Sequence, residues 1–367
     1  MNRSIFTKTF SGLGLGLALM GSMAKADAYS VVYTMDNAVN ANHVLVFQQD
    51  ENGALHGAGS VATGGGGTGT VLSNQSSVIL SHDGQWLFAC NAGSDEISVF
   101  STADNRIQLV DKVNSGGQMP LSLALHHNVL YVLNASGLVG GKDNITGFFF
   151  VDGRLVALPG STRALSADNT GPAEVAFTRD GNTLIVTERL TNLIDTFTVG
   201  DDGLPAVHQT FASSGADPFG FSVDHQDRIL VAEATDSTAS SYSVSDDGGL
   251  NVISASVPTK QQAACWLTLT PDEQYAYTAD AGSGTLSGFS VATDGRLHLL
   301  ESDGVAADIG NGSHPVDMAP SHDGQFLFSL ANGNGTLNAF RIADNGSLKS
   351  LGATSGIPAS AAGLAAR

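Results

Sequence analysis

The sequence predicts an all-β fold, a seven-bladed β-propeller with four antiparallel strands in each blade. Three observations support this fold: an aromatic position recurs every 45 to 53 residues, a tight turn follows each recurrence, and the two ends of the chain complement each other. Gly and Asx turns interrupt every apolar run at strand length, so no helical period develops. The recurring aromatics are Phe47, Phe100, Phe149, Phe197, Tyr242, Phe289 and Phe340.

Each repeat contains two hairpins. The turn after the aromatic is rich in Asn-Gly and Asp-Gly pairs, which supply the positive φ angles of tight hairpins, as in Asn52-Gly53, Asp152-Gly153, Asp294-Gly295 and Asn345-Gly346. A second turn lies upstream, as in His82-Asp83-Gly84, Arg179-Asp180-Gly181, Pro271-Asp272-Glu273 and His322-Asp323-Gly324. Two hairpins provide four strands, which make one propeller blade.

The chain ends supply the seventh blade. Residues 28–60 hold only the last three strands of a repeat, and residues 357–366 hold only a first strand, with Pro358 in the slot of Pro172, Pro218 and Pro315. We therefore expect the C-terminal strand to complete the N-terminal blade, so that no strand edge is left unpaired. The whole of residues 27–367 is then one propeller domain.

Residues 1–26 have the pattern of a cleavable export signal. Arg3 and Lys8 precede the short apolar run Leu13–Met20, and Ala24-Lys25-Ala26 forms a small-x-small cleavage site. We expect cleavage after Ala26 and a periplasmic or secreted protein. No later stretch is long and apolar enough to span a membrane.

The charge balance narrows the classes of partner. Removal of the signal takes away three positive charges and no negative ones, so 13 Lys and Arg face 35 Asp and Glu, a balance of −22. Such a surface repels nucleic acids and anionic lipid headgroups. We expect a monomer that binds a small molecule, and two buried free thiols, because Cys90 and Cys265 fall in non-neighbouring blades.

One segment resembles a known family. Residues 171–181 (GPAEVAFTRDG), followed by Val186-Thr187-Glu188, are similar to a motif of the lactonase family of seven-bladed propellers, which includes bacterial 6-phosphogluconolactonases and fungal carboxymuconate lactonising enzymes. The resemblance covers the mature chain and implies lactone hydrolysis or cycloisomerisation. A subgroup shares residues 218–221 (PFGF) and 263–266 (AACW).

The chain departs from the family at several motif positions. An Arg-His pair implicated in the family's chemistry is replaced here by Ala173 and Glu174, and Ala232-Glu233 stands where Asn-Arg is usual. Only the glutamate at Glu188 matches. The cations that would hold a substrate phosphate are therefore missing from these slots.

The propeller predicts where a site would lie, because its innermost strands line a central channel. A first ring at the start of these strands comprises Ser77, Ser122, Glu174, Gly220, Trp266, Asp317 and Ser360. A second ring at the end of the next strands comprises Asp36, Asn91, Asn134, Glu188, Glu233, Asp280 and Asn332. Asn and Asp in the second ring can also be simple turn formers, whereas Glu is a poor one.

These rings yield two hypotheses for a site at one channel mouth. In the first, Glu188, Glu233 and Glu174 are catalytic carboxylates, one of them with a pKa raised by its neighbours. The substrate contacts in this hypothesis are Arg189, Trp266, Asp317, His314 and Phe219. In the second, oxygen ligands bind Ca²⁺ or Mg²⁺, with Asp280, Asn134 and Asn91 as candidates.

A non-catalytic alternative remains open, in which the propeller is a binding or scaffold module for a protein or a small ligand. The histidines are little help in choosing. We interpret His82, His225, His322 and the pair His126-His127 as solvated turn residues that face away from the expected mouth. His314 differs, because it precedes Pro315 and lies near the first ring.

Overall fold

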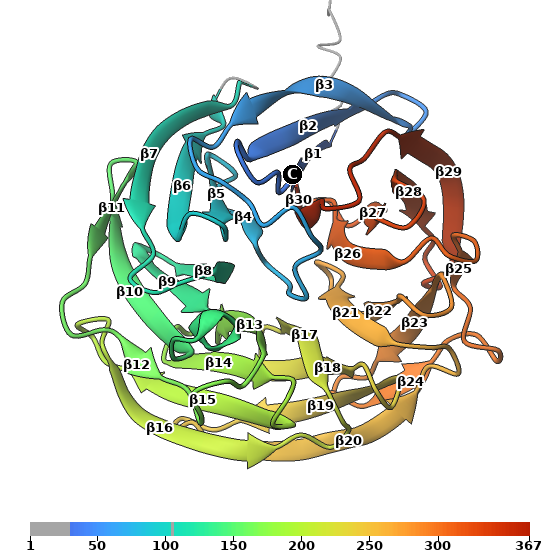
Figure 1. The fold of residues 1–367 in the computed structure, drawn as a ribbon. Coiled ribbons are helices and arrows are strands. Elements are labelled where there is room, and N and C mark those ends of the chain that lie inside the picture. The colour runs from blue at the N-terminus through green and yellow to red at the C-terminus, as the bar shows by residue number, and fades with distance from the viewer. Residues whose placement is uncertain (1–29, 104–105) are drawn as a thin grey trace, which may run out of the picture.

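The computed structural model describes residues 30–103 and 106–367, and these form a ring of seven antiparallel sheets (Figure 1). The expected signal peptide lies outside the described residues. Blade 1 contains β1 (Val31–Met35), β2 (His43–Gln49), β3 (Leu55–Ala62) and, innermost, β30 (Ala362–Ala366). Blade 2 contains β4 (Val78–Leu80), β5 (Trp86–Asn91), β6 (Glu96–Ser101) and β7 (Gln108–Asn114). Blade 3 contains β8 (Pro120–His126), β9 (Val129–Asn134), β10 (Asn144–Val151), β11 (Arg154–Ala157) and β12 (Arg163–Ala164), with the 3₁₀ helix η2 (Ser136–Val139).

The other four blades repeat the pattern from the innermost strand outward. Blade 4 contains β13 (Pro172–Phe177), β14 (Thr183–Glu188), β15 (Leu193–Val199) and β16 (Pro205–Ala212). Blade 5 contains β17 (Pro218–Val223), β18 (Arg228–Glu233), β19 (Thr238–Val244) and β20 (Leu250–Pro258). Blade 6 contains β21 (Ala264–Leu269), β22 (Tyr275–Asp280), β23 (Thr285–Val291), β24 (Leu297–Leu299) and β25 (Ala307–Asp308). Blade 7 contains β26 (Pro315–Pro320), β27 (Phe326–Ala331), β28 (Thr336–Ile342) and β29 (Leu348–Ser355).

The expected ring closure is confirmed. Strand β30 pairs antiparallel with β1, with Tyr33 opposite Ala365, so the C-terminal strand completes blade 1. The expected position of Pro358 is wrong. Strands β13, β17 and β26 each begin at a proline, but β30 begins at Ala362, four residues after Pro358.

The repeated aromatic residue lies on the third strand of each blade and is buried. Phe100 and Phe289 are fully buried, and Phe197 is 1% exposed. Blade 3 differs from the expectation by one residue. Leu130 of β9 pairs with Phe148, as Leu87 of β5 pairs with Phe100, so Phe148 rather than Phe149 occupies the repeated position. Successive strand residues point to opposite faces, and Phe149 accordingly lies half-buried on the other face.

The register corrects two members of the expected rings. In blade 4, Glu188 is the last residue of its strand and pairs with Leu193; in blade 7 the same place is taken by Ala331, which pairs with Thr336. Asn332 therefore lies one residue beyond the second ring. In blade 1, Met35 pairs with Ala362, so Ala362 rather than Ser360 belongs to the first ring.

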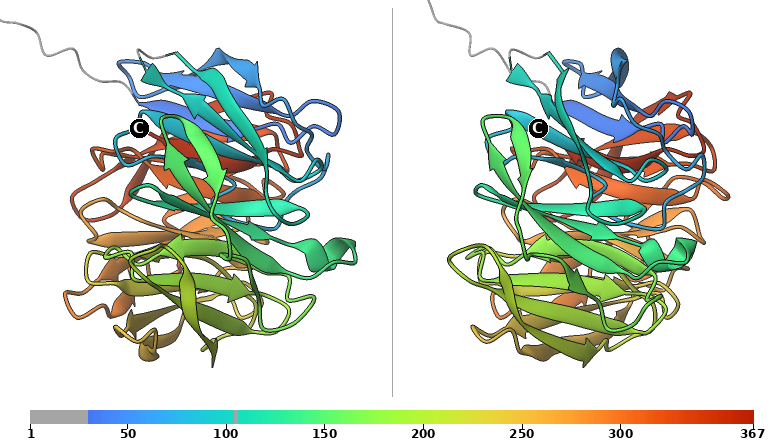
Figure 2. Two further views of the ribbon diagram at one scale, coloured as in Figure 1. Left: turned by 90° about the vertical axis from the view of Figure 1, so that its left-hand side faces the viewer. Right: turned by 60° about the vertical axis from the view of Figure 1, so that its left-hand side comes forward.

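The two faces of the ring differ in what they carry. Figure 2 shows the ring from the side, with η2 on one face and the C-terminus on the other. We call the η2 face, where the innermost strands begin, the upper face and the other the lower face. Both cysteines are free, with Cys90 buried and Cys265 only partly buried, in blades 2 and 6. Among residues 30–103 and 106–367, no helix is long and apolar enough to cross a membrane.

Candidate functional site: the central channel

The segment 72–76, between β3 and β4, enters the channel from the upper face, and we call it the channel plug (Figure 1). Gln75 of the plug donates from Nε2 to the carbonyl oxygens of Leu267, at 2.8 Å, and Phe221, at 3.3 Å. Its Oε1 accepts the N–H of Leu267 at 3.1 Å. The plug therefore ties blades 5 and 6 to the chain that precedes blade 2.

Gln75 accepts a backbone N–H of an innermost strand, as a first-ring side chain does in other blades. In blade 3, the Ser122 hydroxyl accepts the N–H of Val175 in the next blade, at 3.1 Å. Gly220, the first-ring residue of blade 5, has no side chain, and Gln75 supplies the acceptor for blade 6 instead. A Cβ atom at Gly220 would lie 1.9 Å from the Gln75 Oε1, so only glycine leaves room for the plug.

Glu174 is buried beside the plug, with 3% of its surface exposed. Its Oε2 accepts the N–H of Phe221 at 2.6 Å, and its Oε1 accepts the hydroxyl of Ser76 at 2.7 Å. Burial raises the pKa of Glu174 well above its usual value, the nearby Asp317 raises it further, and the two hydrogen bonds oppose the shift. This shift of the pKa favours the protonated form of Glu174.

Asp317 is a second buried acid of the first ring, 2% exposed. Its Oδ1 accepts the N–H of Met318 at 2.8 Å, while its Oδ2 is buried without a hydrogen-bond partner among the described residues. Burial raises the pKa of Asp317 well above its usual value. The first ring thus contributes two buried carboxyl groups with raised pKa values, from blades 4 and 7.

The second-ring side chains are hydrogen-bonded to nearby loops and strands, and Asn91 of blade 2 also accepts from Asn42 and Thr63 at the edge of blade 1. Glu233 is fully buried and accepts hydrogen bonds from the N–H of Gly215, at 2.8 Å, and the hydroxyl of Ser240, at 2.6 Å, with Ser213 and Thr238 as further donors. In three blades, the residue seven positions after the second-ring residue supplies a hydroxyl group that is hydrogen-bonded to the second-ring side chain. The pairs are Asn91 with Ser98, Glu233 with Ser240, and Asp280 with Ser287.

Blade 4 breaks this rule, because the residue seven positions after Glu188 is Asp195. Both carboxyl groups are fully buried. Burial and the adjacent Asp195 raise the pKa of Glu188 to about 7, against hydrogen bonds from Ser166 and Thr191. The Nε2 of His208 lies 2.9 Å from the Asp195 Oδ2.

The structure therefore does not join Glu188, Glu233 and Asp280 into one acidic cluster. The tentative cation ligands are also apart, since Asn134 and Asn91 lie in blades 3 and 2, and Asn134 donates to Asn144 of its own blade at 3.0 Å. Over the described ranges, no group of three or more His, Cys, Asp or Glu side chains could hold a metal ion.

Three of the expected substrate contacts do meet at the upper face. The Arg189 guanidinium lies 4.6 Å from the Phe219 ring centroid, and Phe219 packs against Trp266 with centroids 4.8 Å apart. Arg189 Nε also donates to Asp217 at 2.9 Å. The two aromatics are buried, and the Trp266 indole donates to the plug, so they support Arg189 rather than line an open wall. His314 is exposed, whereas Asp317 is buried.

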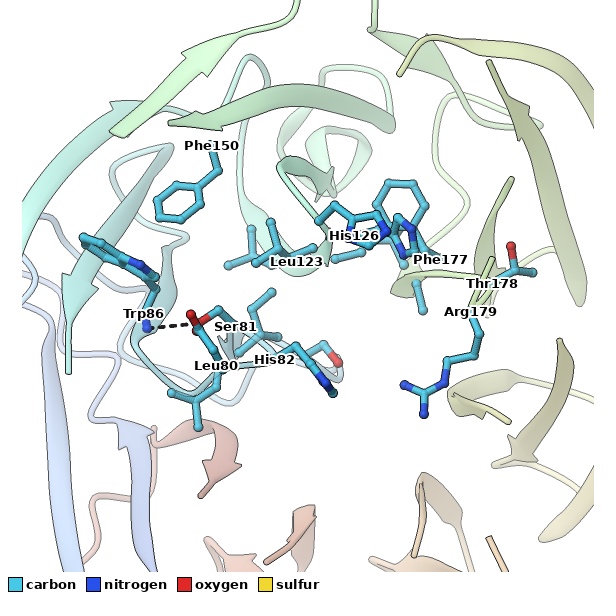
Figure 3. A pocket seen from close by; sticks show the side chains of 18 residues that line it. Leu80, Ser81, His82, Trp86, Leu123, His126, Phe150, Phe177, Thr178 and Arg179 are labelled. Atoms are coloured by element: carbon cyan, nitrogen blue, oxygen red, sulfur yellow. Dashed lines mark hydrogen bonds between the residues drawn. The ribbon is translucent and has the colours of Figure 1, made fainter. Parts of the chain in front are cut away.

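A cavity of about 810 Å³ opens on the lower face between blades 2, 3 and 4 (Figure 3). Ser76 of the plug is among its lining residues, so the cavity reaches the residue that binds Glu174. The turns after the innermost strands form its rim, with His82, His126, His127 and Arg179. Sequence reasoning missed this cavity because these histidines read as solvated turn residues.

The chain belongs to the lactonase family of seven-bladed β-propellers. The family model "Lactonase, 7-bladed beta-propeller" matches residues 25–138, 152–263 and 244–364. A 6-phosphogluconolactonase of Yersinia pestis is 30% identical over 123 residues, which cover 32% of this chain and 36% of that protein. The chain thus spans about a third of the curated relative it matches.

Solved structures extend the likeness of fold to the whole ring. The periplasmic gluconolactonase PpgL of Pseudomonas aeruginosa superposes with a TM-score of 0.74 at 16% identity, covering 92% of this chain and 98% of PpgL. A virginiamycin B lyase of Staphylococcus aureus gives 0.53 at 12% identity, with 74% and 82% covered. Because a hydrolase and a lyase share this fold, the reaction must be argued from the site.

Proposed function

We propose that this protein is an exported lactonase-type enzyme that acts on a small polar cyclic molecule in the central channel. One observation carries the proposal: Glu174, a buried acid whose pKa burial raises well above its usual value, is hydrogen-bonded to Ser76, which lines the cavity. A carboxyl group with a raised pKa, linked to a cavity through one hydroxyl group, is an arrangement that suits general acid catalysis.

In this proposal the Ser76 hydroxyl, which donates to Glu174 in the structure, turns towards the ligand, gives its proton to the ring oxygen of a lactone and takes the proton of Glu174 in exchange. Water adds to the carbonyl carbon, the bond from that carbon to the ring oxygen breaks, and the ring oxygen leaves as a hydroxyl. His126, which lines the same cavity, accepts a proton from the attacking water. Burial, and after it the neighbouring His127, lowers the pKa of His126, which favours the neutral imidazole that can accept a proton. Lactonisation is the same path reversed.

The competing assignment makes Glu188 and Glu233 the catalytic groups. Both are held within their blades, so we expect Glu188→Gln and Glu233→Gln to keep most of the turnover. Glu174→Gln keeps the size of the side chain but cannot release a proton, and we expect it to reduce kcat by about 10² or more. The assay is proton release from a panel of aldonolactones with and without a phosphate group.

The outcomes separate the hypotheses. Turnover that survives Glu174→Gln but falls in Glu188→Gln or Glu233→Gln would move the site to the second ring. If no lactone is turned over, the protein is a non-catalytic binding or scaffold module, an alternative that the replacement of the family's Arg-His pair by Ala173 and Glu174 favours.

We also propose that the protein is periplasmic or secreted, supported by the sequence of residues 1–26 and the likeness to a periplasmic gluconolactonase. N-terminal sequencing of the protein recovered outside the cytoplasm should begin at Asp27. An intact Met1 on all recovered protein would contradict export by cleavage.

A further inference from the structure

One arginine and three histidines gather at the lower mouth of the channel although the chain carries a net charge of −19. His82, His126, His127 and Arg179 all line the cavity. His82, His127 and Arg179 are exposed, and the Arg179 guanidinium has no hydrogen-bond or ion-pair partner within the described part of the chain. In Figure 3, His82 and Arg179 extend towards the open centre of the mouth from different blades. An arginine placed in this way is free to bind an anion.

The acidic groups near these side chains already accept hydrogen bonds from hairpin turns. Asp83 accepts the hydroxyl of Ser81 at 2.5 Å and the N–H of Gln85 at 3.0 Å. The other two acids near the rim are bound similarly: Asp180 by Thr178 and Asn182, and Asp227 by the backbone of Arg179 and Asp180. These carboxylates reduce the positive potential but do not neutralise Arg179 by direct contact.

The walls behind the rim are largely apolar. Trp86 packs edge-on against Phe150 with centroids 5.2 Å apart, and both line the cavity with Leu123, Val175 and Phe177. Most small-molecule sites combine an apolar wall with a few convergent polar groups, and this volume lies within their usual range of about 300–1,000 Å³.

We propose that the lower mouth binds an amphipathic organic carboxylate. The apolar body of the ligand packs against Trp86 and Phe150, and the carboxylate accepts hydrogen bonds from Arg179 and His82. This inference rests on the proposed function only in placing the ligand in the same cavity, since binding needs no proton from Glu174.

The three acids facing the rim are Asp83, Asp180 and Asp227. Hydrogen bonding by Ser81 lowers the pKa of Asp83, and burial, which would raise the pKa of Asp180, is outweighed by its hydrogen bonds.

Titration calorimetry and tryptophan fluorescence test the proposal with cyclohexanecarboxylate as the probe, which does not absorb where tryptophan does. Trp86 reports from the cavity wall. The uncharged cyclohexanecarboxamide should bind at least about tenfold more weakly, and Arg179→Gln should weaken carboxylate binding about tenfold, the loss expected for one charged hydrogen bond. His82→Ala should also weaken carboxylate binding, because His82 lines the same mouth.

Matched controls come from the same chain. His322 occupies the same His-Asp-Gly turn in blade 7 and does not line the cavity, and Arg154 is an exposed arginine of β11. His322→Ala and Arg154→Gln should bind the probe as the parent protein does. Equal affinity for carboxylate and carboxamide, or binding indifferent to Arg179→Gln, would overturn the proposal.

The same experiment separates this inference from the proposed function. Carboxylate binding by a protein that turns over no lactone upholds the inference and refutes the lactonase proposal. Lactone turnover without binding of the probe does the opposite. Glu174→Gln should still bind the probe, because Glu174 does not line the cavity.

Discussion

Gly220→Ala tests how the channel plug is held. The new Cβ would lie 1.9 Å from the Gln75 Oε1, inside any allowed contact distance, so Gln75 must leave its position. It then loses three hydrogen bonds, two to carbonyl oxygens and one from the Leu267 N–H. At about 1 kcal/mol net for each bond, the free energy of unfolding should fall by about 3 kcal/mol.

The double variant sharpens the test. Gln75→Ala loses the same three bonds and should cost about 3 kcal/mol by itself. Since Gly220→Ala acts by displacing Gln75, the variant with both changes should cost little more than Gln75→Ala alone. Urea denaturation gives the three values, and Gly57→Ala is the control, because Gly57 is exposed and a Cβ there meets no atom within 4 Å. Effects that add to within about 0.5 kcal/mol would refute the reasoning.

Three further predictions concern stability. Burial raises the pKa of Asp280 to about 7 against three hydroxyl hydrogen bonds, so the folded state keeps a proton that the unfolded chain releases near 3.8. The resulting stability is complete below pH 3.8 and is lost as the pH rises through 7. Asp280→Asn should flatten that loss in a series of denaturation measurements from pH 4 to 8. Asp195→Ser gives blade 4 the hydroxyl that Ser240 gives Glu233; it should lower the pKa of Glu188 and flatten the same profile, and an unchanged slope would contradict this. Deletion of residues 362–367 removes β30 and leaves β1 with a bare edge, so the protein should aggregate in size-exclusion chromatography and be rescued by a peptide of residues 357–367.

The ring could be predicted from the sequence, but its register could not. Spacing identifies seven repeats because each blade needs one buried aromatic and two turns. The spacing does not fix which of two adjacent residues faces the core. The sequence therefore predicts Phe149 at the position that Phe148 occupies in the structure. Bulges interrupt the pairing between the first and second strands, as between Pro172 and Glu174, and in blade 1 a residue count along the chain gives Ser360 where the register has Ala362.

The candidate site was harder to predict, because its parts come from different blades. The path of the plug depends on Gln75 replacing a side chain at Gly220, 145 residues further along the chain, and nothing local in the sequence signals that exchange. The cavity rim is built from hairpin turns, whose histidines and arginine have an ordinary turn composition. Only the closed ring brings His82, His126 and Arg179 to one mouth.

The buried glutamates show why residue type alone misleads. Glu is unusual at a strand end, which made Glu188 and Glu233 look functional. In blade 5 the unusual residue is explained by hydroxyl and N–H donors that surround the Glu233 carboxylate, so its burial needs no substrate. Glu174 differs in its access to a ligand, because its hydrogen-bonded partner Ser76 lines a cavity. Access to a ligand, rather than burial or an unusual residue, therefore distinguishes the group that could transfer a proton from those that hold a blade together.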